Sequence, residues 1–255
     1  MKALRFTLLI LTTGLLPLPA AAALKVLTCE PEWAALAREI GGERLVVSSA
    51  TTGMQDPHHI EARPSLIARA RQADLLVCTG AELEAGWLPL LLRESANPAI
   101  QPGQPGYFEA ARYVKLLEKP AAADRAQGDV HAAGNPHLHL DPRKLLYVAE
   151  ALSKQLAELD PAGASDYKSR QADFSTRLKA AIARWEKQGA TLKGVPVLVQ
   201  HKSWSNLVDW LGLNVIADLE PKPGIEPSAS HLAQILERLR AQPAKMILRA
   251  GFLSP

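Results

Sequence analysis

Short apolar runs alternate with stretches of helical periodicity along most of this chain, and this alternation restricts the fold more than any other feature of the sequence. Strands are predicted at residues 25–28, 44–48, 74–78 and 113–117, with helices at 33–40, 64–71, 83–93 and 142–159. Beyond residue 193, the pattern predicts strands at 195–200, 214–217 and 245–249 and helices at 203–211 and 229–241. Such alternation is typical of parallel sheets built from β/α units.

A long amphipathic stretch at residues 165–192 follows a break at Asp160-Pro161-Ala162-Gly163. At 1.5 Å per residue such a helix is about 40 Å long, which is more than one small lobe needs. We therefore predict an α/β fold of two β/α lobes with parallel sheets, 24–163 and 193–255, joined by a spine helix at 164–192. The alternative is a single domain with one long core helix. The second lobe is much shorter than the first and is expected to be incomplete.

The first 23 residues are predicted to be a secretory signal peptide rather than part of the fold. Lys2 and Arg5 precede an apolar stretch at 6–18, and the small residues at 20–23 supply an A-x-A cleavage site. The apolar stretch is too short to span a bilayer. The residues before Cys29 make a poor lipid-attachment signal, so we expect a soluble exported protein without a lipid anchor.

The charge balance argues against a nucleic-acid partner. The chain has 29 basic and 26 acidic side chains, for a formal net charge of +3, and aromatic residues make up 5% of it. The basic residues form no cluster, and the aromatic content is too low to suggest a stacking platform for bases. We therefore expect no nucleic acid among its partners.

Two cysteines, Cys29 and Cys78, each end a predicted strand. If the two strands are parallel neighbours, the thiols lie at the same edge of one sheet. Export to an oxidising compartment permits a disulfide, which would stabilise the chain by about 4 kcal/mol. Free buried thiols and a metal-ligand role are the alternatives.

Histidines gather in three loop-like contexts, each beside a predicted strand or helix. His58 and His59 lie in DPHHIE, His137 and His139 in NPHLHLDP, and His201 in VQHK. Ligand sites of open β/α sheets form at strand-to-helix turns, where neutral imidazoles from several turns can bind one transition metal ion. The sequence has no G-x-S-x-G, P-loop, H-E-x-x-H or C-x-x-C motif, so metal binding is favoured over these chemistries.

The ordered segments DPHHIEARPS, GNPHLHLDP and VLVQHKSW, set around a long Ala-rich helix, resemble those of the ZnuA/TroA-type metal-binding receptors. These are the periplasmic solute-binding components of zinc and manganese ABC importers, and the resemblance covers residues 24–249. It implies two β/α lobes joined by a rigid helix, with the metal ion in the cleft between them. It also implies a periplasmic monomer that delivers the ion to the membrane permease of an importer with its ATPase.

Carried over position by position, the resemblance makes His58, His137 and His201 the metal ligands. His59 and His139 fall at positions that the family does not use as primary ligands, so they are expected behind the ligands or on the surface, and His231 is expected to be exposed on a helix. A further histidine, His131, lies with Asp124 and Asp129 where zinc members often carry a His/Asp-rich insertion. We therefore treat His131, His59 and His139 as possible auxiliary metal residues.

Three neutral imidazoles favour Zn²⁺ over Mn²⁺, which prefers a larger share of oxygen ligands. Manganese-type members often have a carboxylate where His201 stands, which also favours zinc. The family's fourth ligand is a carboxylate beyond the strand predicted at 245–249, whereas this chain ends at Pro255. The resemblance therefore implies a truncated C-terminus and a fourth position filled by water or an anion, with Glu220 and Glu226 as the next candidates.

Two other functions remain open on the sequence. The run His137-x-His139-x-Asp141 superficially resembles the H-x-H-x-D of zinc hydrolases, although Pro136 and Pro142 favour a loop over a strand. We expect a receptor and not an enzyme. An exported adhesin or a metal chaperone without a transporter would use the same ligands, and the sequence does not distinguish either from a receptor.

Overall fold

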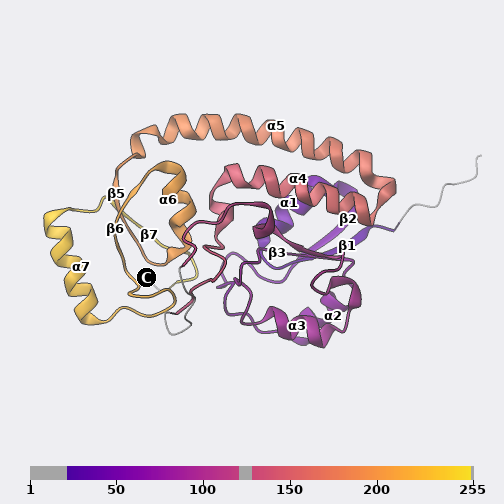
Figure 1. Cartoon of the computed structure of the whole chain (residues 1–255), viewed down its shortest axis with the longest axis horizontal. Coiled ribbons are helices and arrows are strands. Elements are labelled where there is room, and N and C mark those ends of the chain that lie inside the picture. The colour runs from indigo at the N-terminus through magenta and orange to yellow at the C-terminus, as the bar shows by residue number, and fades with distance from the viewer. Residues whose placement is uncertain (1–21, 121–127, 254–255) are drawn as a thin grey trace, which may run out of the picture.

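The computed structural model describes residues 22–120 and 128–253, in which two parallel sheets are bridged by one long helix (Figure 1). Most of the predicted signal peptide, and Asp124, lie outside the described residues. The first sheet has the order β2-β1-β3-β4, and all its neighbouring strands are parallel. Its strands are β1 (Leu24–Thr28), β2 (Leu45–Ser49), β3 (Leu75–Cys78) and β4 (Tyr107–Glu109).

Helices cover both faces of the first sheet, and the alternation of side chains along each strand fills two apolar cores. Leu75 and Val77 of β3 face the core beneath α1 (Pro31–Gly41) and α4 (Pro142–Leu159). Leu76 and Cys78 face the opposite core, beneath α2 (Pro64–Arg71) and α3 (Leu88–Ser95). This two-sided burial explains why the strands read as continuous apolar runs.

The strand predicted at 113–117 is wrong. The fourth strand is β4, which lies a few residues earlier in the chain, where no strand was predicted, and a 3₁₀ turn at Ala110–Tyr113 then takes the chain off the sheet. Val114 and Leu116 pack against the core beneath α4, so their two-residue periodicity reflects packing on helices and not strand pairing.

The helix predicted to begin at residue 83 begins only at Leu88. Gly80, Ala81 and Glu82 all have positive φ, which interrupts helical geometry. The Glu84 carboxylate then accepts hydrogen bonds from the backbone N–H groups of Thr79 and Gly80 and holds this segment as turns.

The predicted spine is α5 (Ala164–Gly189), a helix of 26 residues that runs along both lobes (Figure 1). Near its start, the buried Tyr167 donates a hydrogen bond to Asp160, and the helix packs on α1 and α4. Near its end, Trp185 packs edge-on against Trp210 of the second lobe, with ring centroids 6.3 Å apart. The prediction of a long helix joining two lobes is confirmed, whereas the boundaries proposed at residues 163 and 193 stay predictions.

The second lobe is a three-stranded parallel sheet of order β6-β5-β7. Its elements are β5 (Pro196–Val199), α6 (Ser205–Leu211), β6 (Asn214–Asp218), α7 (Ala229–Ala241) and β7 (Met246–Leu248). The fully buried cluster of this lobe consists of Leu198, Ala217 and Ile235. All five elements coincide with predicted ones to within two residues at either end.

Cys29 and Cys78 form a disulfide at the carboxyl edge of the first sheet, with Cα atoms 4.7 Å apart. The strands that precede them, β1 and β3, are parallel neighbours, as the sequence analysis expected. In the described ranges, no helix has the length and apolar character needed to cross a membrane.

Candidate metal centre

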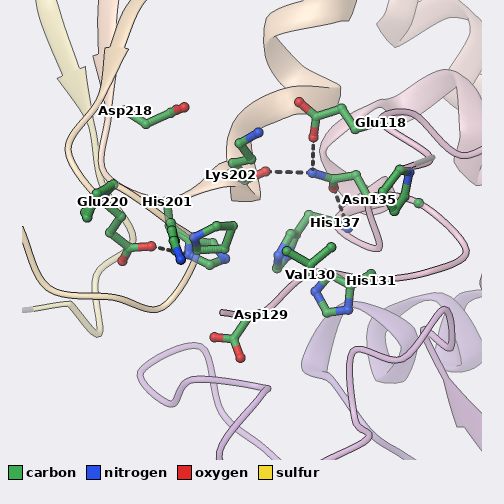
Figure 2. A pocket seen from close by; sticks show the side chains of 15 residues that line it. Glu118, Asp129, Val130, His131, Asn135, His137, His201, Lys202, Asp218 and Glu220 are labelled. Atoms are coloured by element: carbon green, nitrogen blue, oxygen red, sulfur yellow. Dashed lines mark hydrogen bonds and ion pairs between the residues drawn. The ribbon is translucent and has the colours of Figure 1, made fainter. Parts of the chain in front are cut away.

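Four histidine rings from three connecting segments of the chain meet between the two lobes, and Figure 2 shows three of them, His131, His137 and His201. His58 lies in the loop after β2, His131 and His137 lie between β4 and α4, and His201 follows β5. The ring centroid of His58 is 5.4 Å from that of each of the other three, and His137 and His201 are 5.6 Å apart. The three histidines that the resemblance singled out are therefore brought together, with His131 beside them.

His58 is fixed by the loop residue two positions before it. Its backbone N–H and its Nδ1 both contact Oδ1 of Asp56, at 3.0 and 2.7 Å. Burial raises the pKa of Asp56, but the hydrogen bonds from His58 outweigh it and lower that pKa below its usual value. An ionised carboxylate can only accept, so Nδ1 of His58 carries a proton, and in the neutral imidazole Nε2 is then the nitrogen with the lone pair.

His137 is placed by Asn135, whose Oδ1 accepts the His137 backbone N–H at 3.0 Å. The ring is only 5% exposed. Burial, followed by the neighbouring His58, lowers the pKa of His137 well below its usual value. The imidazole is therefore neutral at neutral pH, which is the form that binds a metal ion.

His201 is oriented by a carboxylate of its own lobe. Oε2 of Glu220 accepts from Nδ1 of His201 at 2.7 Å and also from the backbone N–H of Gly224 at 2.7 Å. A carboxylate bonded to one nitrogen of an imidazole fixes the tautomer and directs the other nitrogen toward a metal ion. Glu220 thus binds His201 through Nδ1 and leaves its Nε2 for a metal ion. Glu226 is exposed and does not line the cavity.

His131 lies among the three expected ligands, although the sequence suggested only an auxiliary role. Its ring stacks on that of His58, and each of His58, His131 and His137 has a nitrogen within 4.8 Å of a nitrogen of the others. Burial, followed by the neighbouring His58, lowers the pKa of His131 to about 4. Its only sequence signal was a single histidine in a loop of small residues.

Nε2 of His58, His131 and His137 is buried without a hydrogen-bond partner among the described residues. Buried polar atoms in folded proteins are almost always hydrogen-bonded, so such an atom calls for an explanation. Three of them gathered at one point form a set of unused lone pairs, which is the donor arrangement that a borderline transition metal ion prefers.

The remaining histidines lie away from this cluster or at its rim. His59 is 69% exposed, with Nε2 3.9 Å from Asp129, and Nδ1 of His139 lies 3.1 Å from Glu32 of α1. His231 is not simply exposed as expected, because its Nε2 is hydrogen-bonded to the backbone carbonyl of Asp218.

The H-x-H-x-D run does not form a hydrolase-type ligand cluster. His139 lies against Glu32, and Asp141 caps α4 and binds Arg143. Of the three side chains in the run, only that of His137 joins the histidine cluster.

His131, His137 and His201 line a cavity of about 430 Å³ between the lobes, together with charged side chains of both lobes. Asn135 connects the two walls: its Nδ2 donates to the backbone carbonyl of Lys202 at 2.8 Å and to Glu118 at 2.9 Å (Figure 2). Asn135, which accepts the His137 backbone N–H, is therefore also bonded to Lys202, the residue after His201.

Comparison with known proteins places this arrangement in a family. The model of the family described as "Zinc-uptake complex component A periplasmic" (ZnuA) matches residues 26–254. The chain belongs to the ZnuA family. The fold agrees with this assignment, because the crystal structure of ZnuA superposes with a TM-score of 0.75 at 25% identity, covering 91% of this chain and 84% of that one.

Curated relatives of this ZnuA-family chain carry names that refer to both zinc and manganese. The manganese ABC transporter substrate-binding lipoprotein PsaA of Streptococcus pneumoniae is 27% identical over 179 residues, which cover 69% of this chain and 54% of that protein. The high-affinity zinc uptake system protein ZnuA of Bacillus subtilis is 22% identical over 196 residues, or 75% and 60%. The chain spans about half the length of the first of the curated relatives it matches.

Proposed function

We propose that this protein is a receptor that binds a divalent metal ion, zinc above all, through His58, His137 and His201 and delivers it to the permease of an ABC importer. The observation that carries the proposal is the meeting of these three rings, whose centroids lie 5.4 to 5.6 Å apart, with Nε2 of His58 and of His137 buried and without a hydrogen-bond partner among the described residues. The names of the relatives, which are ABC transporter substrate-binding and zinc uptake proteins, support delivery to an importer with its ATPase.

Zinc is favoured over manganese by the donor set. The clustered side chains offer neutral imidazole nitrogens, and the nearest carboxylates, Asp56 and Glu220, are turned to the outer nitrogens of His58 and His201. Manganese prefers a larger share of oxygen ligands, whereas zinc accepts imidazole readily. The family description, zinc uptake, agrees with this choice.

Binding and release, rather than catalysis, account for the construction of the site. The ligands come from both lobes, so an ion is held only while the lobes stay together and is freed when His201 moves away. No nucleophile motif accompanies the histidines in the sequence. We propose that the receptor acts as a monomer without a nucleic-acid partner.

The proposed location is the periplasm, reached by means of the leader at residues 1–23. Several relatives are lipoproteins by name. In this chain, Cys29 is fully buried and bonded to Cys78, which makes it unsuitable as a lipid-attachment residue. We therefore propose an exported form without a lipid anchor at Cys29.

Zinc titration against a chromogenic chelator at neutral pH tests the site. Alanine at His58, His137 or His201 is expected to weaken zinc binding severely, while His231→Ala, which removes a histidine outside the cluster, leaves it unchanged. Equal zinc affinity in all four variants would contradict the proposal. Permease and ATPase genes beside the gene of this chain would support delivery, whereas an isolated gene would favour a chaperone or an adhesin.

A further inference from the structure

The fourth histidine of the cluster has no role in the ligand set proposed above. His131 is half-buried, its Nε2 has no hydrogen-bond partner in the described part of the chain, and one of its ring nitrogens lies within 4.8 Å of a ring nitrogen of His58 and of His137. A histidine that merely captures ions at the rim would extend into solvent, as His59 does. The position of His131 is that of a ligand.

The loop that carries His131 is held in place from both lobes. On the first lobe, the backbone N–H of Ala132 donates to Oε2 of Glu82 at 2.8 Å. On the second lobe, the backbone N–H of Asp129 donates to the carbonyl of Pro223 at 2.9 Å. The carbonyl of His131 itself accepts from Gly134 at 3.1 Å, which closes a tight turn around the ring.

The two carboxylates that contact the clustered imidazoles are already engaged. Asp56 is bonded to His58, and Glu220 is bonded to both His201 and Gly224. Breaking these contacts would free an oxygen ligand but would remove the group that fixes the tautomer of a histidine ligand. Nε2 of His131 is available without any such loss.

We propose that His131 is a primary ligand and that the site binds its ion through four imidazoles. This inference rests on the proposed function and narrows its substrate. Four neutral nitrogens suit tetrahedral Zn²⁺ and other borderline ions of the later first-row series, and they disfavour Mn²⁺. The carboxylates of Asp56 and Glu220, bonded to the backs of two ligands, offset the charge of the ion.

The test compares zinc and manganese binding to the wild-type chain and to His131→Ala, with His231→Ala, a histidine outside the cluster, as the control. His131→Ala is expected to lower zinc affinity by about 10- to 100-fold, at least the effect of losing an outer-shell partner. His231→Ala is expected to leave it unchanged. X-ray absorption of the zinc-loaded proteins should count four imidazoles in the wild-type chain and three in His131→Ala.

If alanine at position 131 disturbs the loop that carries it, a second variant, His131→Asp, still tests the proposal. His131→Asp restores a donor atom but makes it an oxygen, so manganese affinity relative to zinc is expected to rise about tenfold or more over that of the wild-type chain. Unchanged zinc affinity and an unchanged imidazole count in His131→Ala would overturn this inference alone. If both His58→Ala and His137→Ala still bound zinc as the wild-type chain does, the proposed function would be overturned instead.

Discussion

The two lobes bury very different amounts of apolar surface, although both are parallel β/α units. The sheet of the first lobe is covered on both faces and is tied by the Cys29–Cys78 disulfide. In the second lobe the buried cluster has three members, and Ile247 of β7 and Leu236 of α7 are 57% and 60% exposed. Three of the four clustered histidines lie on the well-packed lobe. The difference suggests that His58, His131 and His137 are held in place by the first lobe before an ion binds. We call these three residues the preformed half-site, to which the second lobe adds His201.

The largest expected effect concerns the disulfide of the first lobe. The double variant Cys29→Ala/Cys78→Ala is expected to lower the free energy of unfolding by about 4 kcal/mol, because the bond closes a chain segment of 49 residues. Denaturant unfolding of the metal-free protein measures this change. An unchanged unfolding midpoint would remove one of the two observations, two-sided burial and the disulfide, that set the first lobe apart from the second.

Zinc should stabilise the lobes unequally. At a free zinc concentration 100 times Kd, binding adds about 2.7 kcal/mol to the stability of whatever region the ion holds together. Hydrogen exchange is expected to slow in β5, β6 and β7 on zinc binding, and this protection should vanish in His201→Ala. Equal protection of both lobes in that variant would contradict the idea of a preformed half-site.

Asn135 is a polar link between the lobes. Its removal should weaken zinc binding about tenfold, since leaving a buried hydrogen-bonding partner unsatisfied costs about 1–3 kcal/mol. Asn135→Ala removes both the acceptor for the His137 N–H and the donor to the Lys202 carbonyl. Asn135→Asp keeps the acceptor alone and should lose less affinity. The exposed Asn214 provides the control Asn214→Ala, and matching affinities for all these variants would exclude a positioning role for Asn135.

The smallest expected effect is a pH dependence confined to the first lobe. Burial, then the neighbouring Glu84 carboxylate, raises the pKa of Glu30 well above its usual value, and burial raises the pKa of Glu84 to about 7. Between about pH 4.5 and 7 the folded state therefore binds more protons than the unfolded state, so the unfolding free energy falls as pH rises through this window.

Glu30→Gln, a neutral isostere, should flatten that slope and raise stability at pH 8 by about 1 kcal/mol, since one pKa unit corresponds to 1.36 kcal/mol. The amide can still accept from the Thr79 hydroxyl, as Glu30 does at 2.9 Å. Glu61→Gln on the exposed surface is the control. Parallel pH profiles for the wild-type chain and Glu30→Gln would argue against a raised carboxyl pKa.

The sequence predicted the architecture well because periodicity reports burial, and most strands here are buried on one or both faces. It failed at 113–117, where alternating apolar residues pack on helices, and at residues 80–84, where positive φ angles and the Glu84 carboxylate hold a turn. His58, His137 and His201 followed from motifs. The position of His131 depends on contacts of its loop with Glu82 and Pro223, which are distant in sequence and leave no local pattern.

The spine helix also sets the scale on which an ion can be held or lost. With 26 residues, α5 is a lever about 39 Å long, and a rotation of about 5° at one end displaces the other by about 3 Å. A zinc–nitrogen bond of about 2.1 Å tolerates changes of about 0.2 Å. If the ion is bound as proposed, a tilt of a few degrees would therefore be enough to detach His201, and unloading the ion would require no wide separation of the lobes.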